Sequence, residues 1–235
     1  MAFTYIFKRV EKKYMLTKEQ YEYLTQAIAP YMSVDSYGET EIRNIYFDNA
    51  DNELIETSLQ KPTYKEKLRL RSYGVPKDDS TVFFEIKKKY RGIVYKRRIS
   101  MKLREAYDYI QTGELPTHLV GNIPVEIDYM VKRYRLAPKA FISYKRVAYA
   151  GNTDPDLRIT FDRDITSRYD DTRLESTAAG HKVLDEDRYL MEIKIPGAMP
   201  LWLAHVLSEK NIFPHSFSKF GTAHIQQQIK LASGF

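Results

Sequence analysis

The stretch from Tyr64 to Arg71 has a basic residue at every second position. Because successive side chains of a β-strand point to opposite faces, this alternation places Lys65, Lys67, Arg69 and Arg71 on one face of a strand. Neighbouring cations on that face lie about 7 Å apart and repel each other by about 2 kcal/mol at an effective dielectric of about 20. An isolated strand of this kind would more often be a solvated surface, but four cations in a row also predict a compensating anion.

The same pattern recurs in almost every strand that the sequence predicts. These strands cover residues 7–16, 40–48, 64–71, 82–89, 93–99, 141–149, 157–162 and 189–195. The later strands place several polar sets on a shared face: Glu85, Lys87 and Lys89; Lys96 and Arg98; Tyr144 and Arg146; Arg158, Thr160 and Asp162; Glu192 and Lys194. Most residues between them are apolar, which predicts that the opposite face packs on a hydrophobic core.

Helices are predicted between the strands, at 51–58, 101–112, 124–136 and 199–210, with another near the C-terminal end. An earlier helix opens at Thr17 to Gln20, which have the spacing of a capping box, and ends at Pro30. The polar stretch 164–187 is predicted as a mobile loop. No internal repeat or flexible linker interrupts the pattern, so residues 1–235 are predicted to form one domain.

An antiparallel sheet that closes on itself would turn the charged faces inward. We therefore expect an α+β fold with an eight-stranded antiparallel β-barrel that forms a charged tunnel, and with helices packed on the outside. The interior of so small a barrel is normally filled by side chains. Long Lys and Arg side chains would fill it if an extended polyanion threaded between them.

Composition limits the chemistry that is open to the chain. A net charge of +6 over 235 residues favours an anionic partner. Without cysteine there is no disulfide or thiolate chemistry, so a metal would rest on oxygen or imidazole ligands. No signal peptide or segment of transmembrane length is found, which predicts a cytoplasmic protein without a membrane segment of its own. The five histidines are scattered and are interpreted as structural or surface residues.

A nucleic acid is a less favoured partner than another polyanion. The basic residues alternate with Leu and Ile, and no stacking aromatic residues are interleaved on the same face. No Ser-His-Asp or cysteine constellation for nucleophilic catalysis is found. The sequence leaves the oligomeric state open.

Several short motifs, each weak alone, carry a resemblance through their order and alternation. They are Glu11-Lys12-Lys13-Tyr14, Ile45-Tyr46-Phe47-Asp48-Asn49, Arg69-Leu70-Arg71-Ser72-Tyr73-Gly74, Phe84-Glu85-Ile86-Lys87, Tyr95-Lys96-Arg97-Arg98, Tyr144-Lys145-Arg146, Leu157-Arg158-Ile159, Glu192-Ile193-Lys194 and Phe217-Ser218-Lys219-Phe220. Over nearly its whole length the chain resembles the VTC (vacuolar transporter chaperone) domain, the polyphosphate polymerase domain of the triphosphate tunnel metalloenzyme (CYTH-like) superfamily. Within that family the chain resembles the bacterial stand-alone form.

The resemblance implies roles for residues at matching positions. The catalytic set is Lys13, Arg69, Arg71, Arg146, Arg158 and Glu192. Phosphate binding is assigned, by resemblance or by the shared strand face, to Lys65, Lys67, Lys87, Lys96, Arg98, Tyr144, Lys194, Ser218 and Lys219. The implied cofactor is a divalent metal, Mn²⁺ or Mg²⁺, with Glu192 as its ligand. Glu11 and Glu85 are further candidate metal ligands, although either could equally pair with a neighbouring lysine.

Two positions depart from the eukaryotic polymerase domain. Ser58 stands where that domain has a further arginine, a loss that Lys65 or Lys67 would have to offset. His215-Ser216 lacks the lysine that precedes the Phe-Ser-Lys motif there. The regulatory SPX domain and the membrane helices of the vacuolar complex are not in this sequence, so coupled transport is not inferred.

The implied function is a polyphosphate polymerase that moves the γ-phosphate of ATP onto a growing polyphosphate chain. One alternative is a tunnel triphosphatase, whose relatives carry a Glu-x-Glu-x-Lys first strand. Here that strand reads Arg9-Val10-Glu11-Lys12-Lys13, so a base replaces one acidic ligand. This exchange favours binding of a long polyanion over two-metal hydrolysis. The other alternative is a domain that binds polyphosphate or nucleotides without turnover.

Overall fold

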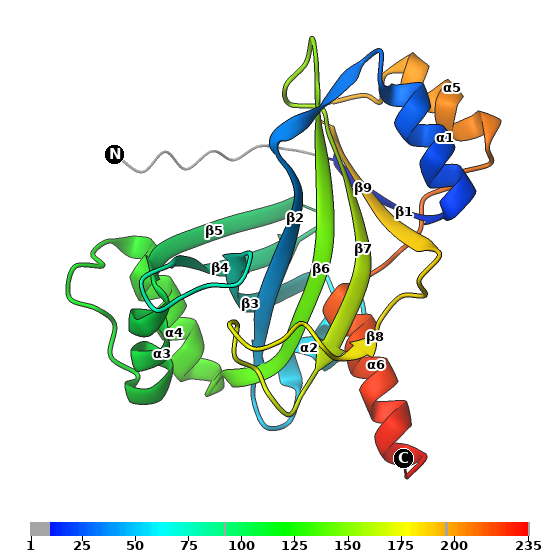
Figure 1. The fold of residues 1–235 in the computed structure, drawn as a ribbon. Helices are drawn as coiled ribbons and strands as arrows, with labels where there is room; N and C mark the ends of the chain where they lie inside the picture. The colour runs from blue at the N-terminus through cyan, green and yellow to red at the C-terminus, as the bar shows by residue number, and fades with distance from the viewer. Residues whose placement is uncertain (1–9, 92, 196, 235) are drawn as a thin grey trace. The chain divides into compact units, whose positions relative to one another are not determined.

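The computed structural model describes residues 10–91, 93–195 and 197–234. The strands in this part of the chain are β1 (Val10–Thr17), β2 (Met32–Asp48), β3 (Tyr64–Tyr73), β4 (Thr81–Tyr90), β5 (Ile93–Lys102), β6 (Ala137–Gly151), β7 (Arg158–Arg168), β8 (His181–Lys182) and β9 (Arg188–Ile195) (Figure 1). The helices are α1 (Lys18–Ile28), α2 (Glu53–Leu59), α3 (Leu103–Thr112), α4 (Asn122–Tyr134), α5 (Leu201–Glu209) and α6 (Lys219–Ala232). The predicted start of the first strand, residues 7–9, lies outside the described residues.

The strands of the described residues form one nine-stranded sheet with the order β1-β9-β7-β6-β2-β3-β4-β5, and β8 pairs with β7. The pairings of β1 with β9, β7 with β9, β2 with β3, β3 with β4 and β4 with β5 are all antiparallel. The prediction of an α+β fold built on an antiparallel sheet is confirmed. The order ends at β1 and β5, and no pairing among the described residues joins these ends, so the predicted closed barrel is not confirmed.

The chain divides into two compact units. Unit 1 contains the described residues up to Thr40 together with Tyr144–Ile165 and Leu184–Ser218. Unit 2 contains Glu41–Ser143, Thr166–Val183 and the described residues from Lys219 onward. Strands β2, β6 and β7 contribute residues to both units. The single domain over residues 1–235 remains a prediction.

The core of unit 1 lies between a sheet face and two helices. Alternate residues of β1, β7 and β9 are apolar, and they pack with α1 and α5, which lie side by side in Figure 1. The predicted capping box opens α1: Gln20 N donates to Thr17 Oγ1, and Thr17 N donates to Gln20 Oε1. Leu24 and Ile28 of α1 are fully buried, and each such side chain contributes about 1.5–3 kcal/mol to the free energy of unfolding.

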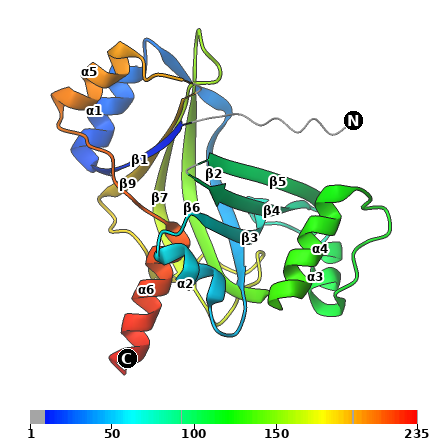
Figure 2. The same cartoon turned by 180° about the vertical axis from the view of Figure 1, so that it is seen from behind.

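The core of unit 2 is built in the same way from β2, β3, β4 and β5. Leu68, Leu70, Phe84 and Ile86 are buried in one cluster with apolar residues of α3 and α4. Figure 2 shows these two helices beside β3, β4 and β5. The strand residues between these apolar residues in sequence therefore point to the other side. Both units thus have one apolar sheet face covered by helices and one opposite face that carries polar side chains.

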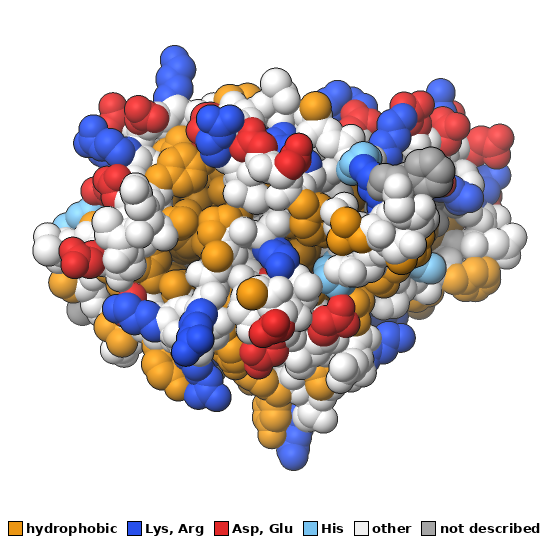
Figure 3. All heavy atoms as spheres, turned by 90° about the horizontal axis from the view of Figure 1, so that it is seen from below, with side chains coloured by type: hydrophobic (Ala, Val, Ile, Leu, Met, Phe, Trp, Pro, Cys, Tyr) orange, Lys and Arg blue, Asp and Glu red, His pale blue; other side chains and the backbone are white. Residues whose placement is uncertain are grey.

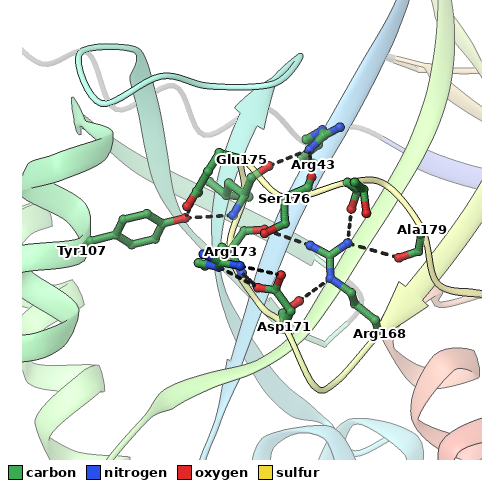
Figure 4. A network of polar contacts seen from close by, with 10 residues as sticks. Arg43, Tyr107, Arg168, Asp171, Arg173, Glu175, Ser176 and Ala179 are labelled. Carbon is green, nitrogen blue, oxygen red and sulfur yellow. Dashed lines mark hydrogen bonds and ion pairs between the residues drawn. The ribbon is translucent and has the colours of Figure 1, made fainter.

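The prediction of a mobile loop at 164–187 is wrong for part of this stretch. Strand β7 continues to Arg168, and β8 adds a short pairing with β7. Between them, buried guanidinium groups bind backbone carbonyl groups of the loop (Figure 4). Arg168 donates to the carbonyls of Asp171, Arg173, Thr177 and Ala179, and Arg43 donates to those of Leu174 and Ser176. A polar sequence read as flexible is instead fixed by two cations, Arg43 of β2 and Arg168 of β7.

Candidate functional site

One polar sheet face belongs to unit 2, and we call it the unit 2 basic face. Strand pairing places Lys67 opposite Lys87 and Lys87 opposite Lys96. In the next row Arg69 lies opposite Glu85, which lies opposite Arg98. Side chains of residues paired in this way share one face. The face comprises Lys65, Lys67, Arg69, Arg71, Glu85, Lys87, Lys89, Lys96 and Arg98.

Glu85 is the centre of this face and is only 1% exposed. Its Oε2 lies 2.6 Å from Arg69 Nη2 and 3.7 Å from Arg71 Nη1, and its Oε1 lies 2.7 Å from Lys96 Nζ. Burial opposes ionisation of Glu85, but Arg69, Arg71 and Lys96 together hold its pKa well below the ordinary value. Burial, reinforced by the two arginines, lowers the pKa of Lys96 to about 8 despite the attraction of Glu85.

These contacts bear on the suggestion that Glu85 holds a metal. Both carboxylate oxygens already contact cations, so a metal ion would compete with three positive side chains. The geometry therefore favours the other interpretation, in which Glu85 pairs with its basic neighbours. It acts as an internal counter-ion that fixes the positions of two arginines and a lysine.

Further contacts orient the other cations of this face. Arg69 Nη1 donates to Tyr46 Oη and Arg71 Nε donates to Asn44 Oδ1, both from β2. Lys65 Nζ donates to the backbone carbonyl of Ser58, 3.1 Å away. That Lys65 or Lys67 offsets the arginine missing at Ser58 remains a prediction. Lys67 lies over the ring of Phe220, and Arg98 over that of Phe83.

A second polar face belongs to unit 1, and we call it the unit 1 mixed face. It comprises Glu11, Lys13, Tyr144, Arg146, Arg158, Thr160, Asp162, Glu192 and Lys194. The first row across β1, β9 and β7 is Glu11, Lys194 and Arg158, and the second is Lys13, Glu192 and Thr160. Cations and carboxylates therefore alternate along β1 and β9 and between these two strands, while β7 adds Arg158 beside Lys194 and Thr160 beside Glu192.

Glu192 lies in the middle of the second row. Its side chain is 12% exposed, and its Oε1 is 2.8 Å from Lys194 Nζ. Lys13 Nζ donates to the Phe217 carbonyl at 3.0 Å and lies 3.9 Å from Glu11 Oε1. Lys13 consequently contacts the Phe-Ser-Lys motif that the sequence assigned to phosphate binding.

Arg146 is held rigidly in this face. Its Nε and Nη2 donate to the two carboxylate oxygens of Asp162 at 2.6 and 2.7 Å, and its guanidinium lies 5.2 Å from the ring centre of Tyr144. Burial works against the charge of Arg146, but Asp162 and Tyr144 raise its pKa well above the ordinary value. Arg158 makes a weaker pair with Asp35, at 3.6 Å.

The structure thus divides the predicted site residues between the two units. Unit 1 holds Glu11, Lys13, Tyr144, Arg146, Arg158, Glu192, Lys194 and Ser218; unit 2 holds Lys65, Lys67, Arg69, Arg71, Glu85, Lys87, Lys96, Arg98 and Lys219. Their roles in binding and catalysis remain predictions. Asp162 and Asn44, which anchor Arg146 and Arg71, were missed as site residues. The alternation of β7 placed Asp162 on the right face, but only strand pairing identifies its partner.

The donors of the unit 1 mixed face fit a divalent cation. Among the described residues no three His, Asp or Glu side chains gather into a ready-made metal cluster. Glu192, however, lies opposite Thr160, whose Oγ1 is buried and has no hydrogen-bond partner among the described residues. Carboxylate and hydroxyl oxygens are ligands that Mg²⁺ and Mn²⁺ accept, and phosphate oxygens of a substrate would supply others.

The surface seen in Figure 3 carries charges of both signs. Lys and Arg side chains are interspersed there with Asp and Glu, and hydrophobic side chains fill the areas between them. In this view the described side chains form no continuous area of positive charge. The net charge of +6 is therefore not presented on this side as one broad basic surface.

Residues 8–226 match the model of the VTC domain family. The chain belongs to the VTC domain family. This confirms the identification made from the sequence motifs. A candidate adenylate cyclase from Bacillus halodurans has a similar structure, with 16% identity, a TM-score of 0.57 and coverage of 89% of this chain and 93% of that chain. At this identity the likeness shows a shared fold alone.

A second solved structure, a candidate adenylate cyclase from Vibrio parahaemolyticus, matches more weakly. It has 10% identity and a TM-score of 0.48, and the match covers 92% of this VTC domain and 97% of that chain. Among the described helices of the VTC domain, none combines the length and apolar character needed to cross a bilayer.

Proposed function

We propose that this VTC domain is a polyphosphate polymerase that transfers the γ-phosphate of ATP to the end of a polyphosphate chain. The unit 2 basic face is the observation that carries the proposal. It gathers eight Lys and Arg residues, Lys65, Lys67, Arg69, Arg71, Lys87, Lys89, Lys96 and Arg98, around one carboxylate. Such an excess of positive charge suits a ligand with many regularly spaced negative charges.

Arginines perform the main binding task in this proposal. Arg69 and Arg71 keep their charge at any physiological pH and can bind phosphate oxygens through two parallel hydrogen bonds. Glu85, Tyr46 and Asn44 fix both guanidinium groups before the ligand arrives. Binding therefore requires little loss of side-chain entropy, which favours correct alignment of the phosphates.

The unit 1 mixed face would complete the reaction. Lys13, Arg146 and Arg158 neutralise and orient phosphate oxygens, and Glu192 holds the divalent metal, Mn²⁺ or Mg²⁺. The metal, when bound, neutralises negative charge on phosphate oxygens. The attacking group is an anionic phosphate oxygen of the chain end, so no side chain has to remove a proton. The proposal includes the predicted eight-stranded barrel, whose interior would accept the polyphosphate chain.

A tunnel triphosphatase is the second candidate. Its first strand would need two carboxylates, and β1 of the described residues offers Glu11 alone. Arg9, the residue that replaces the second carboxylate in the sequence, lies outside the described residues. The remaining alternative, binding without turnover, shares the basic face but would not need Glu192.

The deciding experiment incubates the pure protein with ATP and Mn²⁺ and separates the products on a gel that resolves polyphosphate. We expect a polymer ladder from the wild type, and a loss of at least about 100-fold in turnover for Glu192→Gln, since several kcal/mol of charge stabilisation depend on the metal. Metal-free binding of polyphosphate should persist in this variant. Rapid release of free phosphate without polymer would favour the triphosphatase, and binding without either product would favour the binding domain.

A further inference from the structure

The hydroxyl group of Thr160 is the unusual feature of the unit 1 mixed face. Thr160 is 6% exposed, and among the described residues its Oγ1 has no hydrogen-bond partner. A buried hydroxyl without a partner costs about 1–3 kcal/mol, and such groups are rare in folded proteins. The threonine therefore needs a reason beyond packing.

The surroundings of Thr160 identify the kind of partner that it lacks. It lies opposite Glu192 in the register of β7 with β9, and directly opposite residues have Cβ atoms about 4.5–5.5 Å apart. Arg158 and Asp162 flank it on the same strand face. The hydroxyl thus has the carboxylate of Glu192 across from it, whereas both carboxylate oxygens of Asp162 already bind Arg146. A hydroxyl oxygen opposite a carboxylate can complete the oxygen ligands of a divalent cation.

The general spacing of opposite residues suits one shared ion. Mg²⁺ binds oxygen at about 2.0–2.1 Å, so Glu192 and Thr160 side chains of opposite residues can reach the same ion. Lys194 Nζ contacts Glu192 Oε1 at 2.8 Å, which keeps the carboxylate fixed in this row. The backbones of β7 and β9 would therefore not have to move for Thr160 and Glu192 to bind one ion.

We propose that the hydroxyl oxygen of Thr160 is a ligand of the divalent cation that Glu192 holds. This inference rests on the proposed function for the presence of the metal, and it adds a residue that neither motif nor resemblance assigned to the site. The cation satisfies the buried hydroxyl, and the hydroxyl fixes the cation on the β7 side of Glu192. Thr160 thereby determines where the metal meets the phosphate oxygens.

The test measures Mn²⁺ binding directly, by the electron paramagnetic resonance signal of free Mn²⁺, with and without tripolyphosphate. Thr160→Val keeps the shape but removes the hydroxyl, and it should weaken Mn²⁺ affinity by about tenfold or more. Thr160→Ser should retain the affinity. The thermal midpoint of Thr160→Val should equal or exceed that of the wild type, because no hydrogen bond is lost. If Thr160→Val does not fold, Thr160→Ala takes its place in the same comparison.

Thr166→Val is the matched control on the same strand. Its hydroxyl lies 2.9 Å from Ser143 Oγ and donates to the Ala178 carbonyl, so its removal should lower stability and leave Mn²⁺ affinity unchanged. Wild-type Mn²⁺ affinity in Thr160→Val, or no Mn²⁺ binding by the wild type, would overturn the inference. So would weaker metal-free binding of tripolyphosphate, which would make Thr160 a phosphate donor. If Mn²⁺ binding depends on Thr160 but no polymer forms from ATP, the inference stands and the polymerase proposal falls.

Discussion

The two polar faces follow the same strand alternation but balance their charges differently. The unit 2 basic face has eight cations and the single carboxylate of Glu85, which is buried among three of them. In the unit 1 mixed face, Lys13, Lys194, Arg146 and Arg158 are matched by Glu11, Glu192 and Asp162.

This difference separates two tasks. In a face with a large excess of positive charge, the arginines reinforce the effect of burial in lowering the pKa of Lys96, and such a face gains most from an external anion. A nearly balanced face can accept a metal ion and phosphate oxygens together, because neither sign dominates the local potential. We therefore expect substitutions in the two faces to affect phosphate and metal binding separately.

Glu85→Gln should produce the largest effect. It removes the carboxylate that Arg69, Arg71 and Lys96 share, and breaking a buried ion pair from one side costs about 3–5 kcal/mol of unfolding free energy. Tripolyphosphate should restore part of this loss, because it supplies negative charge and binds only the folded protein. Urea denaturation with and without tripolyphosphate measures both quantities.

Glu126→Gln is the control for this experiment. Glu126 also contacts two cations, Lys88 at 2.8 Å and Arg97 at 2.5 Å, but its side chain is more exposed. Its loss should cost about 1 kcal/mol or less, without rescue by tripolyphosphate. If both variants lost the same unfolding free energy and tripolyphosphate restored it equally, Glu85 would not act as the shared counter-ion of the basic face.

Arg71→Ala tests the division of tasks. Loss of a hydrogen-bonded charge contact should weaken metal-free tripolyphosphate binding by about 10–100-fold, equivalent to about 1.5–3 kcal/mol. Mn²⁺ affinity measured without phosphate should stay unchanged. Glu192→Gln should give the reverse pattern, with Mn²⁺ affinity lost and metal-free tripolyphosphate binding kept. Isothermal titration of both variants with tripolyphosphate and with Mn²⁺ measures these affinities. If either variant lost both affinities, the two faces would not bind phosphate and metal separately.

The smallest effect concerns pH. Because the pKa of Lys96 is lowered to about 8, this lysine loses its charge as the pH rises from 7 to 9. A bound polyanion favours the charged form, so tripolyphosphate affinity should fall over this range by up to about tenfold, with proton uptake on binding. Lys96→Arg should remove this part of the pH dependence, since arginine stays charged. Identical pH profiles for both proteins would show that Lys96 does not titrate at the site.

The lowered pKa of Lys96 also affects the stability of the folded protein. This effect increases with pH, whereas tripolyphosphate affinity decreases with pH. Between pH 8 and about 10.4 the unfolded chain binds more protons at Lys96 than the folded protein does. The contribution of Lys96 to the free energy of unfolding therefore rises with pH in this window. Thermal midpoints of the wild type relative to Lys96→Arg would show this rise.

The sequence alone determined which side chains share a face. The two-residue period of a strand is a local property of the backbone, so the alternation of Lys65, Lys67, Arg69 and Arg71 predicted the basic face before any strand partner was known. The capping box at Thr17 and Gln20 was predictable for the same reason, because its contacts lie within one helical turn.

Local sequence patterns did not predict the start of β2 or the fixed loop before β8, because residues distant in the sequence determine the structure of both segments. Strand β2 begins at Met32, well before the predicted residue 40, because its polar first half has no apolar alternation to mark it. The stretch 169–180 looked mobile, since nothing in its own sequence reveals that Arg43 and Arg168 bind its carbonyls.

Tertiary structure alone decided how the charges are paired. Glu85 touches Arg69, Arg71 and Lys96 because β3, β4 and β5 adopt one particular register, and a shift by one residue would turn Glu85 into the hydrophobic core. Likewise, Asp162 binds Arg146, and Thr160 faces Glu192 with no hydrogen-bond partner for its hydroxyl in the described part of the chain. Such pairs join residues far apart in the chain, and their geometry depends on the packing of whole strands, which no local sequence pattern contains.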